Sequence, residues 1–410
     1  MTLIKPFAGL RPVEGQAHAV VAPPYDVLSS AEARTRAHNR PWSFLHISKA
    51  EIDLPEGTDP HDPVVYEMAA TNLRRMLEAG ILRRDSDPCY YVYRLVMGGH
   101  RQTGLVAVAC VDDYDSSRIR KHEYTRPDKE DDRVRQIEAL NAQTGPVLLA
   151  YPSRPDVDSL LETITTARPD VDLVADDGIG HSLWVVRDGA RIEAITRAFD
   201  AMDALYIADG HHRSAAASRV AAGRRGERGG EAGSAGYFLA VIFPHNQMKI
   251  LDYNRVVRDL NGMSPETFLA SLSGYFAVSP SNDAFRPCAP AEFGMYLGGQ
   301  WYRLNIHPDR IPDDPVRRLD VSLLAESLLA PILGITDPRR DRRIDFVGGI
   351  RGLEELERCV DSGEMRVAFA LYPTRMEDLM AVADAGEVMP PKSTWFEPKL
   401  ADGLVSHVLD

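Results

Sequence analysis

The run from Asp209 to Arg213 combines the residue types that are best suited, in this chain, to binding a phosphate group. It reads Asp-Gly-His-His-Arg, follows the apolar stretch Leu205–Ala208 and precedes an alanine-rich stretch. The apolar residues predict a strand, Gly210 permits a tight turn, and the sequence from His211 onward predicts a helix. A helix start offers unpaired amide donors and the positive end of its dipole, and arginine adds a bidentate cation. The run therefore predicts a phosphate-binding turn.

Two other interpretations of this run stay open. An ordinary strand-turn-helix junction with surface histidines explains the pattern equally well, because helix N-termini are common. A zinc site is less favoured, since the adjacent His211 and His212 point in different directions and no spaced third ligand is evident. We therefore expect no protein-bound metal among these residues.

A second run, Ile119–Arg126, surrounds one acidic residue with cations. It reads Ile-Arg-Lys-His-Glu-Tyr-Thr-Arg. Such a charge run is most often a solvated surface. In a cleft, however, Glu123 could act as a general base on a hydroxyl group, and the neighbouring cations would neutralise a phosphate during its transfer.

A third run, Val388–Phe396, contains two adjacent prolines that hold it extended. Its polar residues Lys392, Ser393 and Thr394 could hydrogen-bond a small polar substrate or a phosphate. The alternative is an ordinary tail tied onto the domain.

The elements that must position these runs mix hairpins with helices. Apolar spacing and turn residues predict helices over residues 65–79 and 128–142, hairpins that turn at Gly98-Gly99, Asp188-Gly189 and Gly298-Gly299, and a flexible loop over 223–236. A regular alternation of strands and helices is lacking. The pattern therefore favours an α+β fold over a doubly wound sheet.

Composition excludes several classes of function. The net charge of −13 argues against a general nucleic-acid binder, which is usually basic. The four cysteines form no CxxC pair, so neither a zinc motif nor a disulfide framework is indicated. No signal peptide or membrane-spanning run is evident, and we expect a soluble cytoplasmic protein.

The three runs occur together, in this order, in one known family. The chain resembles the free serine kinases with a ParB/sulfiredoxin-like fold, and more closely their larger bacterial relatives, long catalogued as a domain of unknown function. The family pattern has a His-Glu pair after a strand, an Asp-Gly-His-His-Arg turn before a helix, and a late Pro-Lys-Ser/Thr-Thr segment. Here these are His122-Glu123, residues 209–213 and Pro391–Thr394. For the larger relatives the resemblance covers nearly the whole chain, including Ala22–Asp26.

The resemblance implies a transfer of phosphate to the hydroxyl of free L-serine, giving O-phospho-L-serine. ATP, ADP or pyrophosphate would be the donor, with Mg²⁺. Glu123 would take the hydroxyl proton, and Asp209 would support that hydroxyl or a metal. The nucleotide would be contacted by Gly210, His211, His212, Arg213, His122 and Arg126. The amino acid would be contacted by Lys392, Ser393 and Thr394.

The sequence pattern places soft joints near residues 85–90 and 260–285, and the resemblance implies what the segments between them would be. Residues 89–260 would form the ParB/sulfiredoxin-like nucleotide-binding core, a mixed sheet with flanking helices. Residues 1–88 would be an N-terminal α/β segment packed on it, and residues 261–410 a C-terminal α+β substrate-binding region. The first hundred residues have no counterpart in the small kinases, and the stretch between Glu123 and Asp209 is longer here. A homodimer is left open.

Three rival functions differ in what they require of the sequence. A ParB-like nucleotide switch on DNA needs a basic surface, which the charge disfavours. A sulfiredoxin-like reductase needs a cysteine in the phosphate turn, where this chain has histidines. A non-catalytic regulator that binds nucleotide or serine is the alternative that the sequence disfavours least, and only Glu123 argues against it.

Overall fold

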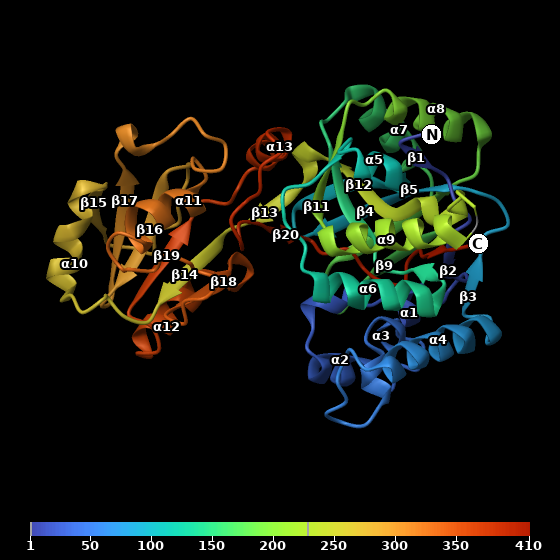
Figure 1. Ribbon diagram of the computed structural model, residues 1–410, viewed down its shortest axis with the longest axis horizontal. Helices are drawn as coiled ribbons and strands as arrows, with labels where there is room; N and C mark the ends of the chain where they lie inside the picture. Colours follow the sequence, from blue (N-terminus) through green and yellow to red (C-terminus); the bar gives the residue numbers. More distant parts are fainter. Residues whose placement is uncertain (1, 228) are drawn as a thin grey trace. The chain divides into compact units, whose positions relative to one another are not determined.

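The chain folds into two compact units (Figure 1). The computed structural model describes residues 2–227 and 229–410. Unit 1 comprises Met1–Met248 and Pro398–Asp410, and unit 2 comprises Lys249–Glu397. Because unit 1 resumes after residue 397, unit 2 is an insertion in the chain of unit 1.

Unit 1 is built on a mixed, nine-stranded sheet. In order across the sheet, its strands are β6 (Ile119–Arg120), β11 (Leu205–Asp209), β8 (Val147–Tyr151), β12 (Tyr237–Pro244), β5 (His100–Cys110), β4 (Tyr90–Met97), β10 (Gly180–Val186) and β9 (Val171–Val174), with β1 (Ile4–Lys5) paired to β5. The pairs β11/β6 and β12/β8 are parallel, and the other pairs are antiparallel.

Strands β8 and β12, near the centre of the sheet, are apolar along their whole length. All eight residues of β12 and all five of β8 are buried. Continuous apolar strands of this kind fit a sheet that is covered on both faces. The hairpin predicted at Gly98-Gly99 is confirmed, because Met97 of β4 pairs with His100 of β5.

Helices cover the sheet of unit 1 in successive layers. Helix α9 packs on β8 and β12, α6 packs on α9, and α4 packs on α6, with α2 and α3 beside α4 at the bottom of this unit in Figure 1. The helices are α1 (Ala17–Val20), α2 (Ser30–Ala37), α3 (Leu45–Ser48), α4 (Pro63–Glu78), α5 (Val111–Asp115), α6 (Pro127–Leu140), α7 (Pro155–Ile164), α8 (Gly189–Asp200) and α9 (His211–Glu227). The helices predicted over 65–79 and 128–142 are thus confirmed as α4 and α6.

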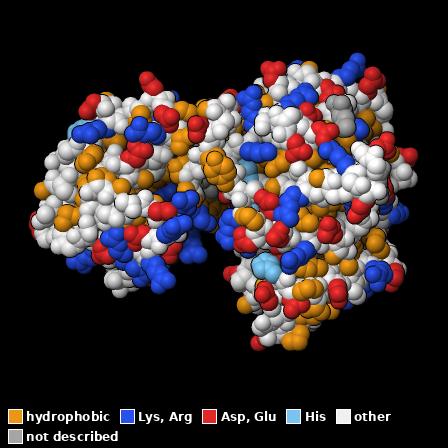
Figure 2. Space-filling view, viewed as in Figure 1, with side chains coloured by type: hydrophobic (Ala, Val, Ile, Leu, Met, Phe, Trp, Pro, Cys, Tyr) orange, Lys and Arg blue, Asp and Glu red, His pale blue; other side chains and the backbone are white. Residues whose placement is uncertain are grey.

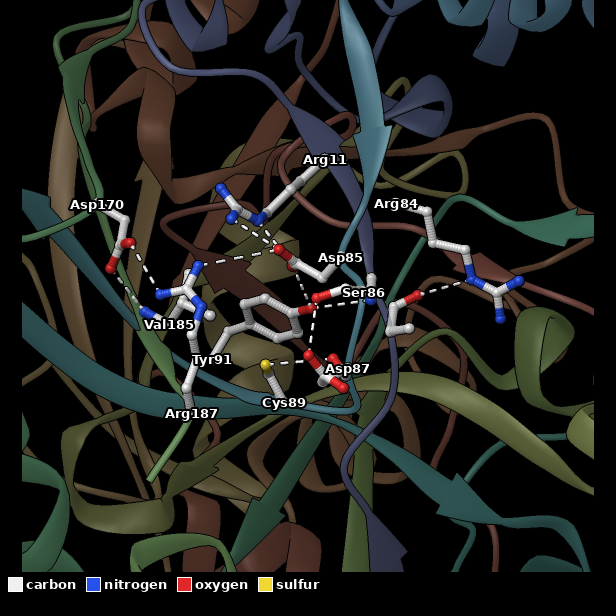
Figure 3. A network of polar contacts seen from close by, with 12 residues as sticks. Arg11, Arg84, Asp85, Ser86, Asp87, Cys89, Tyr91, Asp170, Val185 and Arg187 are labelled. Atoms are coloured by element: carbon white, nitrogen blue, oxygen red, sulfur yellow. Dashed lines mark hydrogen bonds and ion pairs between the residues drawn. The ribbon is translucent and has the colours of Figure 1, made fainter. Parts of the chain in front are cut away.

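A network of polar contacts ties the N-terminal segment to the sheet (Figure 3). The guanidinium of Arg11, on the short strand β2 (Leu10–Pro12), donates two hydrogen bonds of 2.8 Å to the carboxylate of Asp85. The hydroxyl of Tyr91 on β4 donates to the same carboxylate at 2.8 Å. Asp85 directly follows β3 (Leu82–Arg84), which pairs with β2. The segment is therefore fixed to the sheet by charge-assisted hydrogen bonds as well as by apolar packing.

Unit 2 has a six-stranded antiparallel sheet with the strand order β15-β17-β16-β19-β14-β18. These strands are β14 (Tyr253–Val257), β15 (Phe276–Ser281), β16 (Glu292–Leu297), β17 (Gln300–Ile306), β18 (Ile344–Gly348) and β19 (Val367–Leu371). Its helices are α10 (Pro265–Ser271), α11 (Asp320–Leu324), which continues as a π-helical turn to Leu329, α12 (Glu354–Asp361) and α13 (Met376–Asp384). The hairpin predicted at Gly298-Gly299 is confirmed as β16 and β17.

The observed division of the chain differs from the predicted boundaries after residues 88 and 260. The N-terminal segment belongs to unit 1, because β1 pairs with β5 and the apolar cluster of α2, α3 and α4 also includes Leu140 and Ala142. The C-terminal residues 398–410 return to unit 1, where β21 (His407–Val408) pairs with β7 (Ala142–Gln143). The predicted boundaries divide the chain into consecutive segments, so they do not include this return of the chain to unit 1.

Two local predictions were wrong. Asp188-Gly189 does not turn a hairpin; the side chain of Asp188 accepts from the amide of Arg191 and caps the start of α8. The predicted loop over 223–236 begins later, because α9 continues to Glu227. Arg224 and Arg225 donate to Asn141 and Asp112, and these contacts hold the last turn of the helix in place.

Among the described residues, every helix is too short or too polar to cross a lipid bilayer.

Candidate functional site

The predicted strand-turn-helix junction is confirmed. Strand β11 ends at Asp209, Gly210 turns the chain with a φ of +101°, and α9 begins at His211. A Cβ atom on Gly210 would lie 3.2 Å from the guanidinium carbon of Arg213 and 3.3 Å from the Cα atom of Val147. Glycine is therefore required both by the backbone conformation and by the close approach of β8.

The sheet brings the second run to this turn. Strand β6 lies parallel to β11, with Ile119 opposite Leu205 and Arg120 opposite Tyr206. Because parallel strands run in the same direction, the residues that follow them leave the same end of the sheet. His122 and Glu123 come shortly after β6. Asp209 is the last residue of β11, and residues 210–213 follow it. The two runs meet although they are far apart in the sequence.

Direct contacts join His122 and Glu123 to His211. The amide of His122 donates to Nε2 of His211 at 3.4 Å, and the two rings lie nearly perpendicular with centroids 4.4 Å apart. Nδ1 of His211 lies 3.7 Å from Oε2 of Glu123. Both histidines are buried, whereas the side chain of Glu123 is 57% exposed. The carboxylate is thus exposed to solvent, and the two imidazoles lie buried next to it.

His212 points away from His211, as the sequence suggests for adjacent histidines. Its Nε2 accepts from the amide of Arg126 at 3.1 Å, so it fastens the loop after Glu123 to the start of α9. The guanidinium of Arg126 is exposed and pairs with Asp128 at 2.7 Å. Both predicted nucleotide-binding residues therefore lie beside the turn.

Arg213 is held by the protein itself. It donates to the carbonyl of Pro146, to Asp209 at 3.0 Å and to Asp26 at 3.4 Å, and its side chain is only 10% exposed. The predicted role of Arg213 as a phosphate ligand has to compete with these three acceptors. In this structure the guanidinium orients the carboxylate of Asp209, which is 42% exposed.

Two charged residues of this region, Asp26 and Lys399, have no predicted role. Asp26 belongs to the Ala22–Asp26 run, whose occurrence in the larger relatives is the signal that could have identified it. Lys399 lies in the segment that returns to unit 1, and its charge contributes to the low pKa of Asp209. Burial alone would raise the pKa of Asp209, but the charges of Arg213 and Lys399 outweigh it. Asp209 is therefore ionised at neutral pH.

The histidines of the site are neutral at neutral pH. Burial lowers the pKa of His122 to about 4, against smaller opposing effects of a hydrogen bond to the backbone of Ile207 and of the charge of Asp209. Burial, followed by the proximity of His122, lowers the pKa of His211 well below its ordinary value. Burial also lowers the pKa of His212. The imidazoles can thus offer hydrogen bonds or lone pairs to a ligand, but not positive charge.

A cavity of about 30 Å³ lies next to Arg213. It is lined by Tyr25, Arg133, Thr144 and Asp402, among others. This volume suits a water molecule and is far too small for a nucleotide.

The third run lies in unit 2. The hydroxyl of Ser393 donates to the carbonyl of Pro390 at 2.6 Å, and its own carbonyl accepts from Thr374 at 2.8 Å. Lys392 has a φ of +59°, and its carbonyl accepts from Arg255 at 3.0 Å. Ser393 is buried, while Lys392 is exposed and Thr394 is partly exposed. The predicted substrate role of Lys392, Ser393 and Thr394 stays a prediction.

Comparison with known proteins gives the family. The family model described as "Protein of unknown function (DUF1015)" matches residues 4–322. The chain belongs to the DUF1015 family. The predicted membership of the larger relatives is thereby confirmed. Among curated proteins, none matches this DUF1015 protein.

Three solved structures illustrate what this DUF1015 protein is similar to. A conserved hypothetical protein from Pyrococcus furiosus has 14% identity and a TM-score of 0.35, over 74% of this chain and 95% of that one. A free serine kinase in complex with AMP has 14% identity and a TM-score of 0.35, over 73% and 92%. SbnI from Staphylococcus aureus has 13% identity and a TM-score of 0.37, over 72% and 85%. At these values the similarity identifies no substrate.

Proposed function

We propose that this DUF1015 protein is a small-molecule kinase that transfers a phosphoryl group from a nucleotide to the hydroxyl of free L-serine. One observation carries the proposal: His122-Glu123 and the Asp209–Arg213 turn, distant in sequence, form one site with an exposed carboxylate beside a helix start. The same residues form the pattern that resembles the free serine kinases.

The roles follow from the geometry and charges of these residues. The carboxylate of Glu123 accepts the hydroxyl proton as the serine oxygen attacks the terminal phosphorus of the donor. The bond from that phosphorus to the leaving phosphate oxygen breaks, and the leaving group keeps the electron pair. Positioning and neutralisation of charge supply most of the catalysis in such transfers, so a strong base is not required.

The phosphates are held by the amides at the start of α9, from His211 to Arg213, which point out of the helix end. The exposed guanidinium of Arg126 stands beside this helix start and adds positive charge. Arg213 acts mainly by orienting the ionised Asp209, since its donors are already engaged. Asp209 then supports the acceptor hydroxyl.

The proposal includes Mg²⁺ as the ion that accompanies the nucleotide. Mg²⁺ prefers oxygen ligands and keeps several waters, and in such sites it is bound by one or two carboxylates with the phosphates of the substrate. Asp209 is the carboxylate that fits this role, whereas the neutral imidazoles of His122 and His211 do not. Lys392, Ser393 and Thr394 are proposed to contact the amino acid.

A donor-by-acceptor screen tests the proposal. The full-length protein is incubated with Mg²⁺, with ATP, ADP or pyrophosphate in turn, and with L-serine, and O-phosphoserine is followed by ³¹P NMR. L-Alanine, which lacks the hydroxyl, is the control acceptor. Absence of O-phosphoserine with all three donors would refute the proposal. Binding of nucleotide or serine without turnover would instead favour a non-catalytic regulator.

A further inference from the structure

The site brings together three side chains of the kinds that bind metal ions. One possible ligand atom each from His122, Glu123 and His211 lies within 4.8 Å of the others. The adjacency of His211 and His212 argued against a metal, because neighbouring histidines diverge. The structure shows that the divergence is real, but the missing ligands come from the other run.

His122 supplies an independent sign that a ligand belongs here. Its side chain is 3% exposed, and its ring hydrogen-bonds the backbone of Ile207. Its Nδ1 atom nevertheless has no hydrogen-bond partner among the residues that the structure describes. Buried polar atoms are nearly always paired, so an unpaired one points to a water or an ion. A bond from one ring nitrogen to the backbone is also typical of histidines whose other nitrogen binds a metal.

His211 presents its second nitrogen to the carboxylate. Nδ1 of His211 faces Oε2 of Glu123 at 3.7 Å. While Nε2 accepts from the amide of His122 at 3.4 Å, Nδ1 carries the ring proton. Coordination through Nδ1 requires this proton to move to Nε2, so the long contact with the amide of His122 is given up when an ion binds. With metal-ligand bonds of about 2.0–2.1 Å, the ligand atoms of a tetrahedral zinc site lie about 3.3 Å apart. A small movement of the Glu123 carboxylate, which is more than half exposed, closes this difference.

We propose that His122, Glu123 and His211 bind a divalent transition-metal ion, with Zn²⁺ as the representative of the class. Two imidazole nitrogens and one carboxylate suit Zn²⁺ and its first-row neighbours, whereas Mg²⁺ prefers oxygen ligands. Three protein ligands leave a coordination position open to water or to another molecule. The proposal rests on the arrangement of the ligands and does not require the serine kinase reaction.

Metal binding by the full-length protein tests the site directly. The protein is stripped with a chelator, dialysed and titrated with Co²⁺, whose visible absorption reports its ligands, and with Zn²⁺ by calorimetry. Nucleotide and serine are left out, so failure of the kinase proposal does not affect the result. We expect one ion per chain and tetrahedral-type Co²⁺ absorption.

Variants identify the ligands. Loss of a residue that only hydrogen-bonds a metal ligand lowers metal affinity about 10–100-fold. Glu123→Gln removes a ligand itself, so it should lower the affinity at least as much. His211→Gln and His122→Gln should do the same. His212→Gln is the matched control, because that ring faces Arg126, and it should bind Co²⁺ like the wild type.

Two outcomes would overturn the proposal. One is the absence of stoichiometric binding at micromolar Co²⁺ or Zn²⁺, and the other is an equal metal affinity of the wild type and Glu123→Gln. Circular dichroism shows whether the variants of the buried histidines remain folded. If they unfold, Glu123→Gln decides alone, since its exposed side chain can be changed without disturbing the core.

Discussion

Replacement of Arg213 by alanine separates a structural role of this residue from a role in binding phosphate. The guanidinium is 10% exposed and bonds the carbonyl of Pro146, Asp209 and Asp26. If it mainly holds the turn together, Arg213→Ala should destabilise unit 1. If it mainly binds the nucleotide, the variant should fold normally and bind nucleotide poorly.

The expected loss of stability follows from the exposure of the partners. Removal of one partner from a fully buried ion pair costs about 3–5 kcal/mol. The carboxylates of Asp26 and Asp209 are 39% and 42% exposed, so water can resolvate them when the arginine is lost. The carbonyl of Pro146 loses a charged donor as well. We therefore expect a loss of about 2–3 kcal/mol, below the range for a fully buried pair.

Hydrogen exchange measured by mass spectrometry is the suitable assay, because two units need not unfold together. Peptides from β11 and α9 should exchange faster in Arg213→Ala at increasing urea, while peptides from unit 2 should be unchanged. Arg126→Ala is the control, since that side chain is 68% exposed, and it should leave the stability unaltered. Wild-type protection of α9 together with a collapse of nucleotide affinity would refute the reasoning and restore Arg213 as a phosphate ligand.

Three further predictions concern the same site. Glu123→Gln should abolish formation of O-phosphoserine but leave nucleotide binding and thermal stability near those of the wild type, and Glu138→Gln on the exposed face of α6 should change none of the three. Gly210→Ala should cost about 1–3 kcal/mol in urea unfolding, because a positive φ and contact with β8 both oppose a Cβ atom. Burial, partly offset by the charge of Arg213, raises the pKa of Asp402 to about 7, so the folded state holds a proton that the unfolded state releases near pH 4. This contribution to stability is complete below about pH 4 and is lost as the pH rises through about 7, so the advantage of the wild type over Asp402→Asn in unfolding free energy should shrink from pH 5 to pH 8.

Local sequence signals predicted the elements that carry the site. The apolar run before Asp209, the glycine after it and the alanine-rich helix are neighbours in the chain, and each has its own propensity. The hairpin prediction at Asp188-Gly189 was wrong because this dipeptide suits both a hairpin turn and a helix start. The helical spacing of Ile192, Ile195 and Phe199 would have decided for the helix.

These local signals do not predict which distant strands pair with each other. The contact of His122 with His211 depends on β6 lying parallel to β11, and the spacing of residues along the chain does not reveal that pairing. The charge of Lys399 reaches Asp209 only because the chain returns to unit 1 after residue 397. The metal-type cluster was missed for the same reason, since its ligands come from two separate runs.

The insertion of unit 2 also has a consequence for how the protein is made and remodelled. Lys249 and Glu397 are directly opposite each other where β13 (Lys249–Leu251) pairs with β20 (Trp395–Glu397). The two ends of unit 2 therefore lie next to each other, as is typical of a domain that is inserted into the chain of another. During synthesis the ribosome completes this module before it supplies Lys399 and Asp402, so unit 1 can acquire its final charge balance only after the inserted module has emerged.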